Sequence, residues 1–324
     1  MRILVELPTW LGDVVMATPA IENLMSFHND SEVILIGSST SIEIFKNHPN
    51  ISKIHVLDKR YLSLFNLARR LGKFDKFFSF RNTIRSNFFK LFISSRFKYH
   101  YMRGDFENLH QVIKYNNFIN KSLKTEFSAG QLTIYSDNSL KEKSNLSRKK
   151  LPMLGINPGA SYGSAKQWYP EEFASVAAKL SSQYDITILG SPSEIDISMD
   201  IQKLLVKKRV TNYQNLVGKT NISELIDIIS SLDLFITGDT GPMHIAASFQ
   251  IPTISIFGPT RNDETSQWLN KKNIIVKKNL ICQPCMKRVC PLKHNNCMRL
   301  INAEEVLNAV DSLELNLRIK GFVN

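Results

Sequence analysis

Short apolar runs of strand length alternate along the chain with longer stretches of helical periodicity. Near the start, the apolar run 3–7 is followed by a glycine-containing turn, a helical stretch at 14–27 and a second apolar run at 32–37. The order strand, helix, strand is typical of a parallel sheet covered by helices on both faces. The pattern therefore predicts an α/β protein with a doubly wound sheet.

A polar and charged stretch at residues 136–152, which ends in Arg148, Lys149, Lys150 and Pro152, interrupts this alternation. We therefore expect two domains, residues 1–150 and 151–324, each of ordinary domain size. In the second domain the expected strands are 153–158, 185–189, 234–237 and 253–257, and the expected helices are 171–182, 223–231, 244–249 and about 303–317.

The composition is that of a protein with a hydrophobic core. With 43% hydrophobic residues, 14 Gly and 12 Pro among 324 residues, the chain does not resemble a disordered or collagen-like polymer. No stretch approaches the roughly 18 to 20 apolar residues of a membrane-spanning helix, and Glu6 and Pro8 interrupt the first apolar run, so no signal peptide is expected. The four cysteines are clustered near the C-terminus, unlike a disulfide framework. We expect a cytoplasmic protein.

Loops that follow strands are the first places to look for a site, because ligands bind beyond the carboxyl ends of parallel strands. The first such loop is residues 8–13, in which Gly12 would allow a tight turn and Asp13 precedes a helix. Asp13 could be an ordinary N-cap. It could also be a general base, because a carboxylate at a helix N-terminus stays ionised and can accept a proton from a substrate hydroxyl.

The loop 157–170 opens the second domain and holds two glycines and several small residues ahead of Lys166. Its amides and the Lys166 ammonium could surround an anion, and Pro170 suits the first position of the following helix. The sequence does not match the Walker phosphate-binding pattern, so an ordinary connecting loop is the alternative.

The loop 238–244 lies between a strand and a helix expected to begin near His244. Free amides at that helix start, with the Thr240 hydroxyl, could bind phosphate, and His244 could donate as well, although it could equally be a packed side chain. Together with the Lys166 loop, this second anion site suggests a diphosphate. Glu194, in another loop that follows a strand, is a candidate partner of a ribose or sugar hydroxyl.

The cysteines form the pattern C-x2-C-x4-C-x6-C. Such spacing could hold a structural zinc ion, because a closed tetrahedral site needs one CxxC knuckle and two further ligands. Reduced thiols that order a loop, or an adventitious disulfide, are the alternatives. The four residues are Cys282, Cys285, Cys290 and Cys297.

Positive charge is concentrated in residues 59–103, which we call the basic segment. The chain carries a formal net charge of +12. Twelve Lys and Arg fall in the basic segment against one acidic residue, Asp75, and they are interleaved with twelve Phe and Tyr. Such a segment could bind nucleic acid, an anionic membrane surface or a phosphorylated substrate, or it could be a solvated charged face. No RNP, helix-turn-helix or OB signature supports nucleic acid.

At these loops the chain resembles glycosyltransferase family 9, the ADP-heptose:lipopolysaccharide heptosyltransferases, and within that family the heptosyltransferase II group. The resemblance spans essentially the whole chain. It rests on Trp-Leu-Gly-Asp at 10–13 with residues 16–20 behind it, on 158–160 through Lys166 and Pro170, on 239–244, and on the cysteine run. Where relatives commonly have Arg-Trp-Pro, this chain has Gln167-Trp168-Tyr169-Pro170 and therefore lacks the arginine.

The resemblance implies a GT-B fold, with two Rossmann-like doubly wound parallel-sheet domains facing across a cleft and the last helix packing back on the first domain. It implies inverting transfer of heptose from ADP-heptose to a heptose of the inner core on a phosphorylated, Kdo-bearing lipid A acceptor. No cofactor and no active-site metal are expected, nor is nucleic acid. Peripheral contact with the anionic inner face of the inner membrane is expected.

Carried over residue by residue, the resemblance makes Asp13 the general base and places the acceptor on the first domain. The expected donor-binding residues, on the second domain, are Lys166, Glu194, Asp239, Thr240, Gly241 and His244. The expected acceptor-binding residues are Thr9, Trp10, Gly12, Arg81 and Arg85. The alternatives are transfer of the first core heptose, transfer of another sugar by a family member, or a basic nucleic-acid-binding α/β protein.

Overall fold

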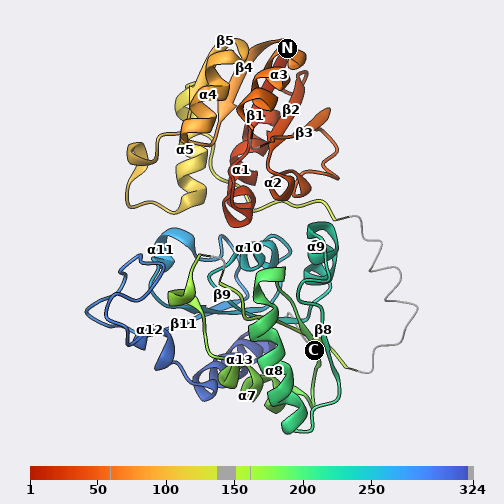
Figure 1. Cartoon of the computed structure of the whole chain (residues 1–324), viewed down its shortest axis with the longest axis vertical. Helices are drawn as coiled ribbons and strands as arrows, with labels where there is room; N and C mark the ends of the chain where they lie inside the picture. Colours follow the sequence, from red (N-terminus) through yellow and green to blue (C-terminus); the bar gives the residue numbers. More distant parts are fainter. Residues whose placement is uncertain (59, 137–150, 161, 320–324) are drawn as a thin grey trace. The chain divides into compact units, whose positions relative to one another are not determined.

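The chain folds into two compact units, Met1–Tyr135 and Ser136–Asn324. The computed structural model describes residues 1–58, 60–136, 151–160 and 162–319, and Figure 1 labels most of their helices and strands. The expected domain boundary at 150/151 adjoins residues 137–150, which lie outside the described part, and the compact units divide at 135/136.

Unit 1 is built on a five-stranded parallel sheet with the strand order β3-β2-β1-β4-β5. The strand order reverses between β1 and β4, as in the Rossmann order 3-2-1-4-5-6 without its last strand. In the register, Glu6 at the end of β1 pairs with Ser79 at the end of β4. The strands are β1 (Arg2–Glu6), β2 (Glu32–Gly37), β3 (Lys53–Val56), β4 (Lys73–Ser79) and β5 (Ser94–His100), and the helices are α1 (Leu11–Phe27), α2 (Ser39–Glu43), α3 (Tyr61–Leu71), α4 (Ile84–Phe92) and α5 (Gln111–Leu123).

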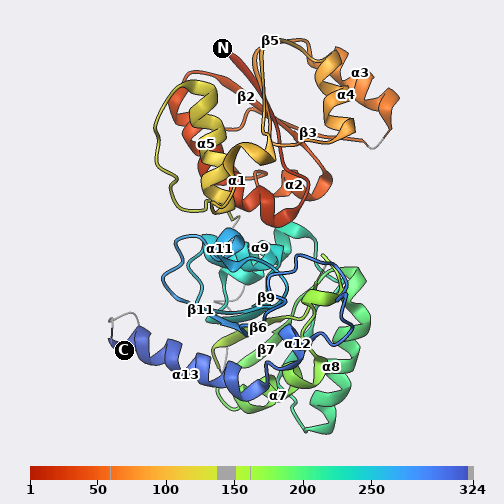
Figure 2. The same cartoon turned by 90° about the vertical axis from the view of Figure 1, so that its left-hand side faces the viewer.

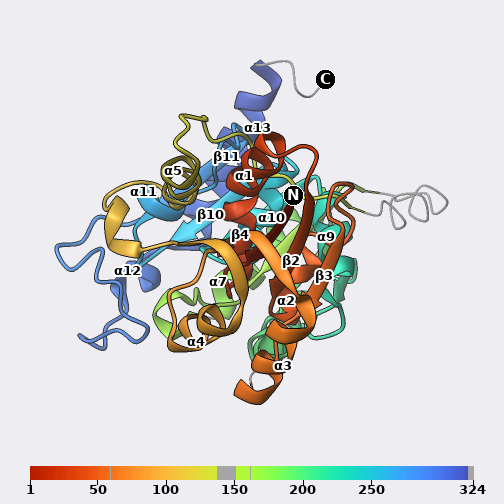
Figure 3. The same ribbon diagram turned by 90° about the horizontal axis from the view of Figure 1, so that it is seen from above.

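Helices cover both faces of this sheet. Figures 2 and 3 show α1 and α5 together on one face and α3 and α4 together on the other. The aromatic residues of β4 explain how both layers are held, because successive strand residues point to opposite faces. Phe77 packs edge-on against Phe89 of α4, whereas Phe78 packs edge-on against Phe118 of α5. Much of the aromatic content of the basic segment is therefore hydrophobic core.

Unit 2 contains a six-stranded parallel sheet with the order β11-β10-β9-β6-β7-β8. Counted from its own first strand, this is the 3-2-1-4-5-6 order of a complete Rossmann fold read from the opposite edge. The strands are β6 (Met153–Asn157), β7 (Asp185–Ile188), β8 (Tyr213–Asn215), β9 (Leu234–Gly238), β10 (Thr253–Phe257) and β11 (Asn273–Lys277), and the helices are α7 (Pro170–Leu180), α8 (Ile195–Lys207), α9 (Ile222–Ser230), α10 (Gly241–Ser248), α11 (Asn262–Thr265), α12 (Asn296–Arg299) and α13 (Ala303–Ile319).

The last helix, α13, packs within unit 2 against α7, β10 and β11. Its apolar residues Val306, Val310 and Leu313 are buried in the same core as Trp168. The Trp168 indole donates a hydrogen bond to the Ile301 carbonyl at 2.9 Å, which ties the segment before α13 to the loop before α7. The expected packing of α13 on the first domain stays a prediction.

The predicted alternation of strands and helices is confirmed, and most predicted ends lie within one or two residues of the observed ones. Pro170 begins α7, as expected. Two helix starts were predicted three residues too late, since α1 begins at Leu11 and α10 at Gly241. Pro242 occupies the first turn of α10, where a missing N–H costs no helical hydrogen bond. Among the described helices, none is long and apolar enough to cross a membrane.

Candidate active site

The switch point of each sheet, where the strand order reverses, carries the loops singled out in the sequence. In unit 1 the switch point lies between β1 and β4, whose following loops lead to Asp13 and to Arg81. In unit 2 it lies between β6 and β9, whose following loops carry Lys166 and Asp239. Crevices at such points are where doubly wound sheets bind ligands. The candidate residues therefore gather at one edge of each sheet.

Lys166 forms the central ion pair of the unit 2 loops. Its Nζ lies 2.5 Å from Oδ2 of Asp239 and donates to the Asp239 carbonyl at 3.1 Å. The hydroxyl of Thr260, which follows β10, donates to the same Oδ2 at 2.7 Å. Both charged side chains are largely buried. The loops after β6, β9 and β10 are thus joined through Asp239, and a cation is held at the carboxyl edge of the sheet.

Thr240 is the N-cap of α10, but its hydroxyl does not cap the helix. Instead it donates to Oδ1 of Asn157 at 3.1 Å, and Asn157 donates through Nδ2 to the Leu189 carbonyl at 2.9 Å. Because no side-chain oxygen caps α10 in the described structure, the first turn keeps the positive end of its dipole available to an anion. Asn157 positions this helix start, a role that sequence reasoning had not given it.

His244 lies in the fourth position of α10 and is buried. It was expected to stand at the helix start, and that placement is wrong because α10 begins a full turn earlier. Gly241 occupies the first helical position, where its amide is one of the groups left unpaired by helix geometry. Donor binding by both residues stays a prediction.

Glu194 is a buried carboxylate that holds two loops together. Only 9% of the residue is exposed, and its Oε2 accepts a hydrogen bond from the Ser191 amide at 2.6 Å. The carboxylate lies so close to Gly159 that a Cβ there would overlap it, which explains a glycine in the Lys166 loop. Its expected contact with the nucleoside stays a prediction.

A loop that carries three of the cysteines accepts hydrogen bonds from the Lys166 loop. The Ala165 amide donates to the Arg288 carbonyl at 3.0 Å, and the Tyr162 hydroxyl donates to the Met286 carbonyl at 2.8 Å. Gly163 has φ +155°, and a Cβ there would collide with Arg288. The segment that contains Cys282, Cys285 and Cys290 is therefore part of what positions Lys166.

The four cysteines are reduced in the described structure, Cys297 buried and the others partly exposed. Backbone amides of residues 292–295 donate to the Cys290 sulfur and lower the pKa of this thiol. Burial and the neighbouring thiols raise the pKa of Cys297 to about 11. Within the described ranges, no group of three or more His, Cys, Asp or Glu side chains is arranged to hold a metal ion. The zinc interpretation stays a prediction.

Asp13 lies in the first turn of α1, three positions after the N-cap, and is partly exposed. The N-cap is Trp10, so the interpretation of Asp13 as an N-cap is wrong. Gly12 is helical and does not form the tight turn that a glycine would allow. Thr9 and Trp10 are exposed at the same helix start. A carboxylate in the first turn of a helix lies beside the positive end of the helix dipole, which favours a negative charge there.

Sequence reasoning missed Glu6, a buried carboxylate at the end of β1. It accepts hydrogen bonds from the hydroxyls of Ser79 at 2.6 Å and Ser86 at 2.5 Å, and its Oε1 lies 3.6 Å from the Arg81 guanidinium. Burial raises the pKa of Glu6, while these hydroxyls and Arg81 lower it in part. The available signal was a single acidic residue in an otherwise apolar strand.

Arg81 is held by this carboxylate at the unit 1 switch point, with only 10% of its side chain exposed. Among the described residues, no hydrogen-bond partner is found for its buried Nε, nor for that of Arg85. A buried nitrogen without a partner is costly, so an anionic ligand at either guanidinium would relieve that cost. The geometry keeps Arg81 and Arg85 as acceptor-binding candidates.

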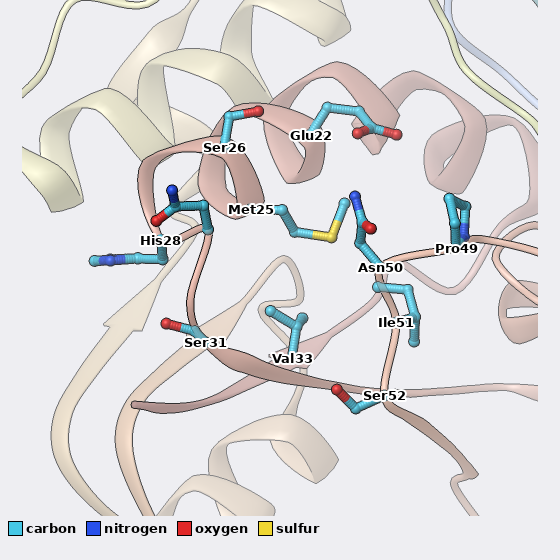
Figure 4. Close-up of a pocket in the computed structure, with 11 residues that line it drawn as sticks. Glu22, Met25, Ser26, His28, Ser31, Val33, Pro49, Asn50, Ile51 and Ser52 are labelled. Atoms are coloured by element: carbon cyan, nitrogen blue, oxygen red, sulfur yellow. The ribbon is translucent and has the colours of Figure 1, made fainter.

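A pocket of about 560 Å³ in unit 1 does not involve the switch-point loops. Figure 4 shows Glu22, Met25 and Ser26 of α1 on one side of it and Asn50, Ile51 and Ser52 on the other. It adjoins the starts of β2 and β3, the edge opposite the carboxyl ends of the strands. We therefore do not assign it to either substrate.

Comparison with known proteins identifies the family. A family model described as glycosyltransferase family 9 (heptosyltransferase) matches residues 68–296. The chain is 38% identical over 319 residues to lipooligosaccharide heptosyltransferase 2 of Campylobacter jejuni, covering 98% of this chain and 99% of the relative.

Two solved structures share the fold. ADP-heptose LPS heptosyltransferase II of E. coli has a TM-score of 0.81 at 20% identity, over 98% of this chain and 100% of the other. A family 9 glycosyltransferase from Veillonella parvula has a TM-score of 0.85 at 22% identity, over 97% of both chains. The expected pair of parallel-sheet α/β domains of the GT-B class is confirmed. The family match also decides for an enzyme and against the nucleic-acid-binding alternative. The chain belongs to glycosyltransferase family 9, the heptosyltransferases.

Proposed function

We propose that the protein transfers heptose from ADP-heptose to a heptose of the lipopolysaccharide or lipooligosaccharide inner core, with inversion at the anomeric carbon. The observation that carries the proposal is the 38% identity, over nearly the full length of both chains, to a lipooligosaccharide heptosyltransferase 2. The unit 2 switch point supports the donor, because it combines a buried lysine with an uncapped helix start.

On the donor side, the leaving ADP carries away a negatively charged diphosphate. Lys166 and the first amides of α10, at Thr240 and Gly241, are fixed positive groups that would stabilise this charge without a metal ion. Asp239 holds the Lys166 ammonium in place and would lie beside the transferred sugar. His244 and Glu194 complete the proposed donor site, His244 near the phosphates and Glu194 near the nucleoside.

On the acceptor side, Asp13 would accept the proton of the attacking hydroxyl. The acceptor oxygen forms a bond to the anomeric carbon as the bond from that carbon to the diphosphate oxygen breaks, and ADP leaves with the electron pair. Attack from the face opposite ADP inverts the anomeric configuration. The support is the partly exposed position of Asp13 in the first turn of α1, with Thr9, Trp10 and Gly12 around it.

Arg81 and Arg85 would bind the anionic groups of the acceptor. A phosphorylated core that bears acidic Kdo sugars offers oxygens that match guanidinium donors. Glu6 would act through Arg81 as a positioning residue, because its carboxylate lies against the guanidinium and not at the surface. We place the enzyme in the cytoplasm, at the inner face of the inner membrane, where such an acceptor would be reached.

The proposal is tested by incubating the purified protein with ADP-heptose and a panel of truncated lipid A cores, followed by mass spectrometry. A mass increase of one heptose on cores that already carry one heptose is expected. Heptose addition to a core that carries only Kdo would indicate transfer of the first heptose. Absence of transfer from ADP-heptose, with transfer from another nucleotide sugar, would contradict the donor.

A further inference from the structure

The outer side of the α3–α4 layer exposes an unusual amount of apolar surface. Leu62 is 72% exposed, Ile84 82% and Leu91 76%. Aromatic rings join the two helices beside them, because Tyr61 packs edge-on against Phe88 and Phe65 packs edge-on against Phe92. We call this the α3–α4 surface and define it by Tyr61, Leu62, Phe65, Ile84, Leu91 and Phe92.

Positive charge accompanies the α3–α4 surface on α3 itself and on the edge strand β5, and two acidic residues of unit 1 already have partners. The Arg69 guanidinium lies 5.7 Å from the centre of the Phe65 ring, and Arg96 lies 5.2 Å from that of Phe97 on β5. Asp58 pairs with Arg60, and Asp75 accepts a hydrogen bond from the Arg2 amide. Within the described part of the chain, Arg69 and Arg96 make no ion pair with a carboxylate. The surface therefore combines exposed leucine and isoleucine with uncompensated positive charge.

We propose that the α3–α4 surface docks the enzyme on an anionic lipid bilayer. Leucine and aromatic side chains enter the region between headgroups and acyl chains, while arginines remain at the headgroups and pair with their phosphates. Charge favours this occupant over a second copy of the chain, because two copies meeting through this surface would bring like charges together. Single exposed apolar residues need no partner, but several of them on two helices that pack side by side are typical of an interaction site.

Docking there would serve the acceptor side of unit 1. Helices α3 and α4 begin at the carboxyl ends of β3 and β4, so Leu62 and Ile84 lie toward the same sheet edge as Asp13 and Arg81. Figure 2 shows the two helices together on their own face of the sheet, away from α1 and α5. The role in catalysis rests on the proposed function, whereas the lipid binding itself does not.

The test measures binding of the full-length protein to vesicles by flotation, without substrates. Vesicles of phosphatidylethanolamine with phosphatidylglycerol are compared with vesicles of phosphatidylcholine. The test variants are Leu62→Ser with Leu91→Ser, and Arg69→Glu with Arg96→Glu. The matched control is Val206→Ser with Lys207→Glu, which changes one exposed apolar and one exposed basic residue on α8 of unit 2.

We expect wild-type protein to bind the anionic vesicles, less at high salt, and to bind the neutral vesicles weakly. Each test variant should lower the vesicle-binding constant about tenfold or more, because buried apolar area and headgroup attraction both contribute. The control should bind like wild type. The KM for an acceptor embedded in vesicles should rise in the test variants, with no change in kcat or in the KM for a deacylated, soluble acceptor.

Equal vesicle binding by wild type and both test variants would overturn the proposal. So would a concentration-dependent dimer that Leu62→Ser with Leu91→Ser abolishes while vesicle binding is unchanged, which would assign the surface to a second copy. Vesicle binding that depends on these residues, in a protein that fails to transfer heptose, would support docking and contradict only the proposed reaction.

Discussion

The Lys166 ammonium is held 2.5 Å from the Asp239 carboxylate, at the point where the loops after β6 and β9 meet. A diphosphate that binds there competes with Asp239 for the same ammonium. Asp239 also accepts a hydrogen bond from the Thr260 hydroxyl, which holds the carboxylate from a second side. The ion pair therefore keeps a cation oriented at the proposed donor site.

Removing the Lys166 ammonium should weaken ADP binding. A charge-assisted hydrogen bond contributes about 1.5–3 kcal/mol, so Lys166→Ala is expected to raise the dissociation constant for ADP roughly tenfold to a hundredfold. Isothermal titration calorimetry measures this directly. The control Lys179→Ala removes an exposed lysine near the end of α7 and should bind ADP normally. An unchanged dissociation constant in Lys166→Ala would remove the lysine from the donor site.

Replacing Asp13 by asparagine should stop transfer and leave donor binding intact. Asparagine keeps the size of the side chain but cannot accept the proton, so kcat is expected to fall about 10²- to 10⁴-fold. ADP-heptose affinity should stay the same, since the proposed donor-binding residues lie in unit 2. Asp30→Asn, an exposed acidic residue just after α1, is the control. Turnover by Asp13→Asn close to that of wild type would exclude Asp13 as the base.

The strand and helix pattern could be predicted because it depends on local periodicity. Parallel strands buried on both faces appear as short apolar runs, and the loops after them carry the candidate residues wherever the strands pair. Helix starts were less certain. Trp10 is the N-cap of α1 without a side-chain hydrogen bond, so the usual N-cap residue types gave no signal, and Asp13, three residues later, was left as either an N-cap or a general base.

Contacts between residues distant in sequence could not be predicted from one sequence. Glu6 and Ser79 are 73 positions apart and meet only because β1 pairs with β4. Asn157 and Thr240 are 83 positions apart and meet through the pairing of β6 with β9. Both positioning residues, Glu6 and Asn157, stand at strand ends at a switch point. Knowledge of the strand order would have been needed to find them.

Arg81 should be needed for the acceptor and not for the donor. Arg81→Gln is expected to raise the KM of a soluble, deacylated core acceptor about tenfold or more at low salt, with the KM for ADP-heptose unchanged. Glu6→Gln should raise it less, since glutamine can still accept from Ser79 and Ser86 but no longer attracts the guanidinium. Arg70→Gln, on α3, is the control. Equal effects on both substrates would indicate a structural role for Arg81.

Two histidines should make unit 1 less stable as the pH falls from about 6.5 to about 4. Burial and neighbouring positive groups lower the pKa of His28 and that of His100 to about 4, whereas an unfolded histidine has a pKa of about 6.5. The unfolded chain therefore binds more protons in this range, and acid favours unfolding. The raised pKa of Glu6 acts in the opposite direction, favouring the folded state as pH falls.

Thermal unfolding followed by circular dichroism between pH 7 and pH 4 separates the contribution of the two histidines from that of Glu6. The unfolding temperature of His28→Gln with His100→Gln should fall less between pH 7 and pH 4 than that of wild type, because the variant lacks the two histidines that favour unfolding in acid. Glu6 is present in both proteins, so its contribution cancels in this comparison. His110→Gln would be a poor control, since His110 caps α5. His55→Gln would also be poor, because burial lowers its pKa too. His294→Gln in unit 2 also removes an acceptor, that of the Asn296 amide, so it serves only to compare how the unfolding temperature changes with pH and not the temperature itself. Parallel curves for wild type and the double variant would contradict the assignment.

Cys290 should be alkylated long before Cys297. Backbone amides stabilise the Cys290 thiolate, and thiolate is the reactive form, whereas burial keeps Cys297 protonated with a pKa of about 11. Brief treatment with iodoacetamide at pH 7.5, followed by peptide mass spectrometry, measures the order in which the cysteines are alkylated.

If all four cysteines are instead protected until a chelator is added, and elemental analysis finds one zinc ion per chain, the thiols are metal ligands and the expected order is wrong. The segment containing the first three cysteines supports the Lys166 loop through Arg288 and Met286, so either result bears on the donor site. Modification of Cys290 should weaken ADP binding only if it moves the Arg288 and Met286 carbonyls that hold the Lys166 loop.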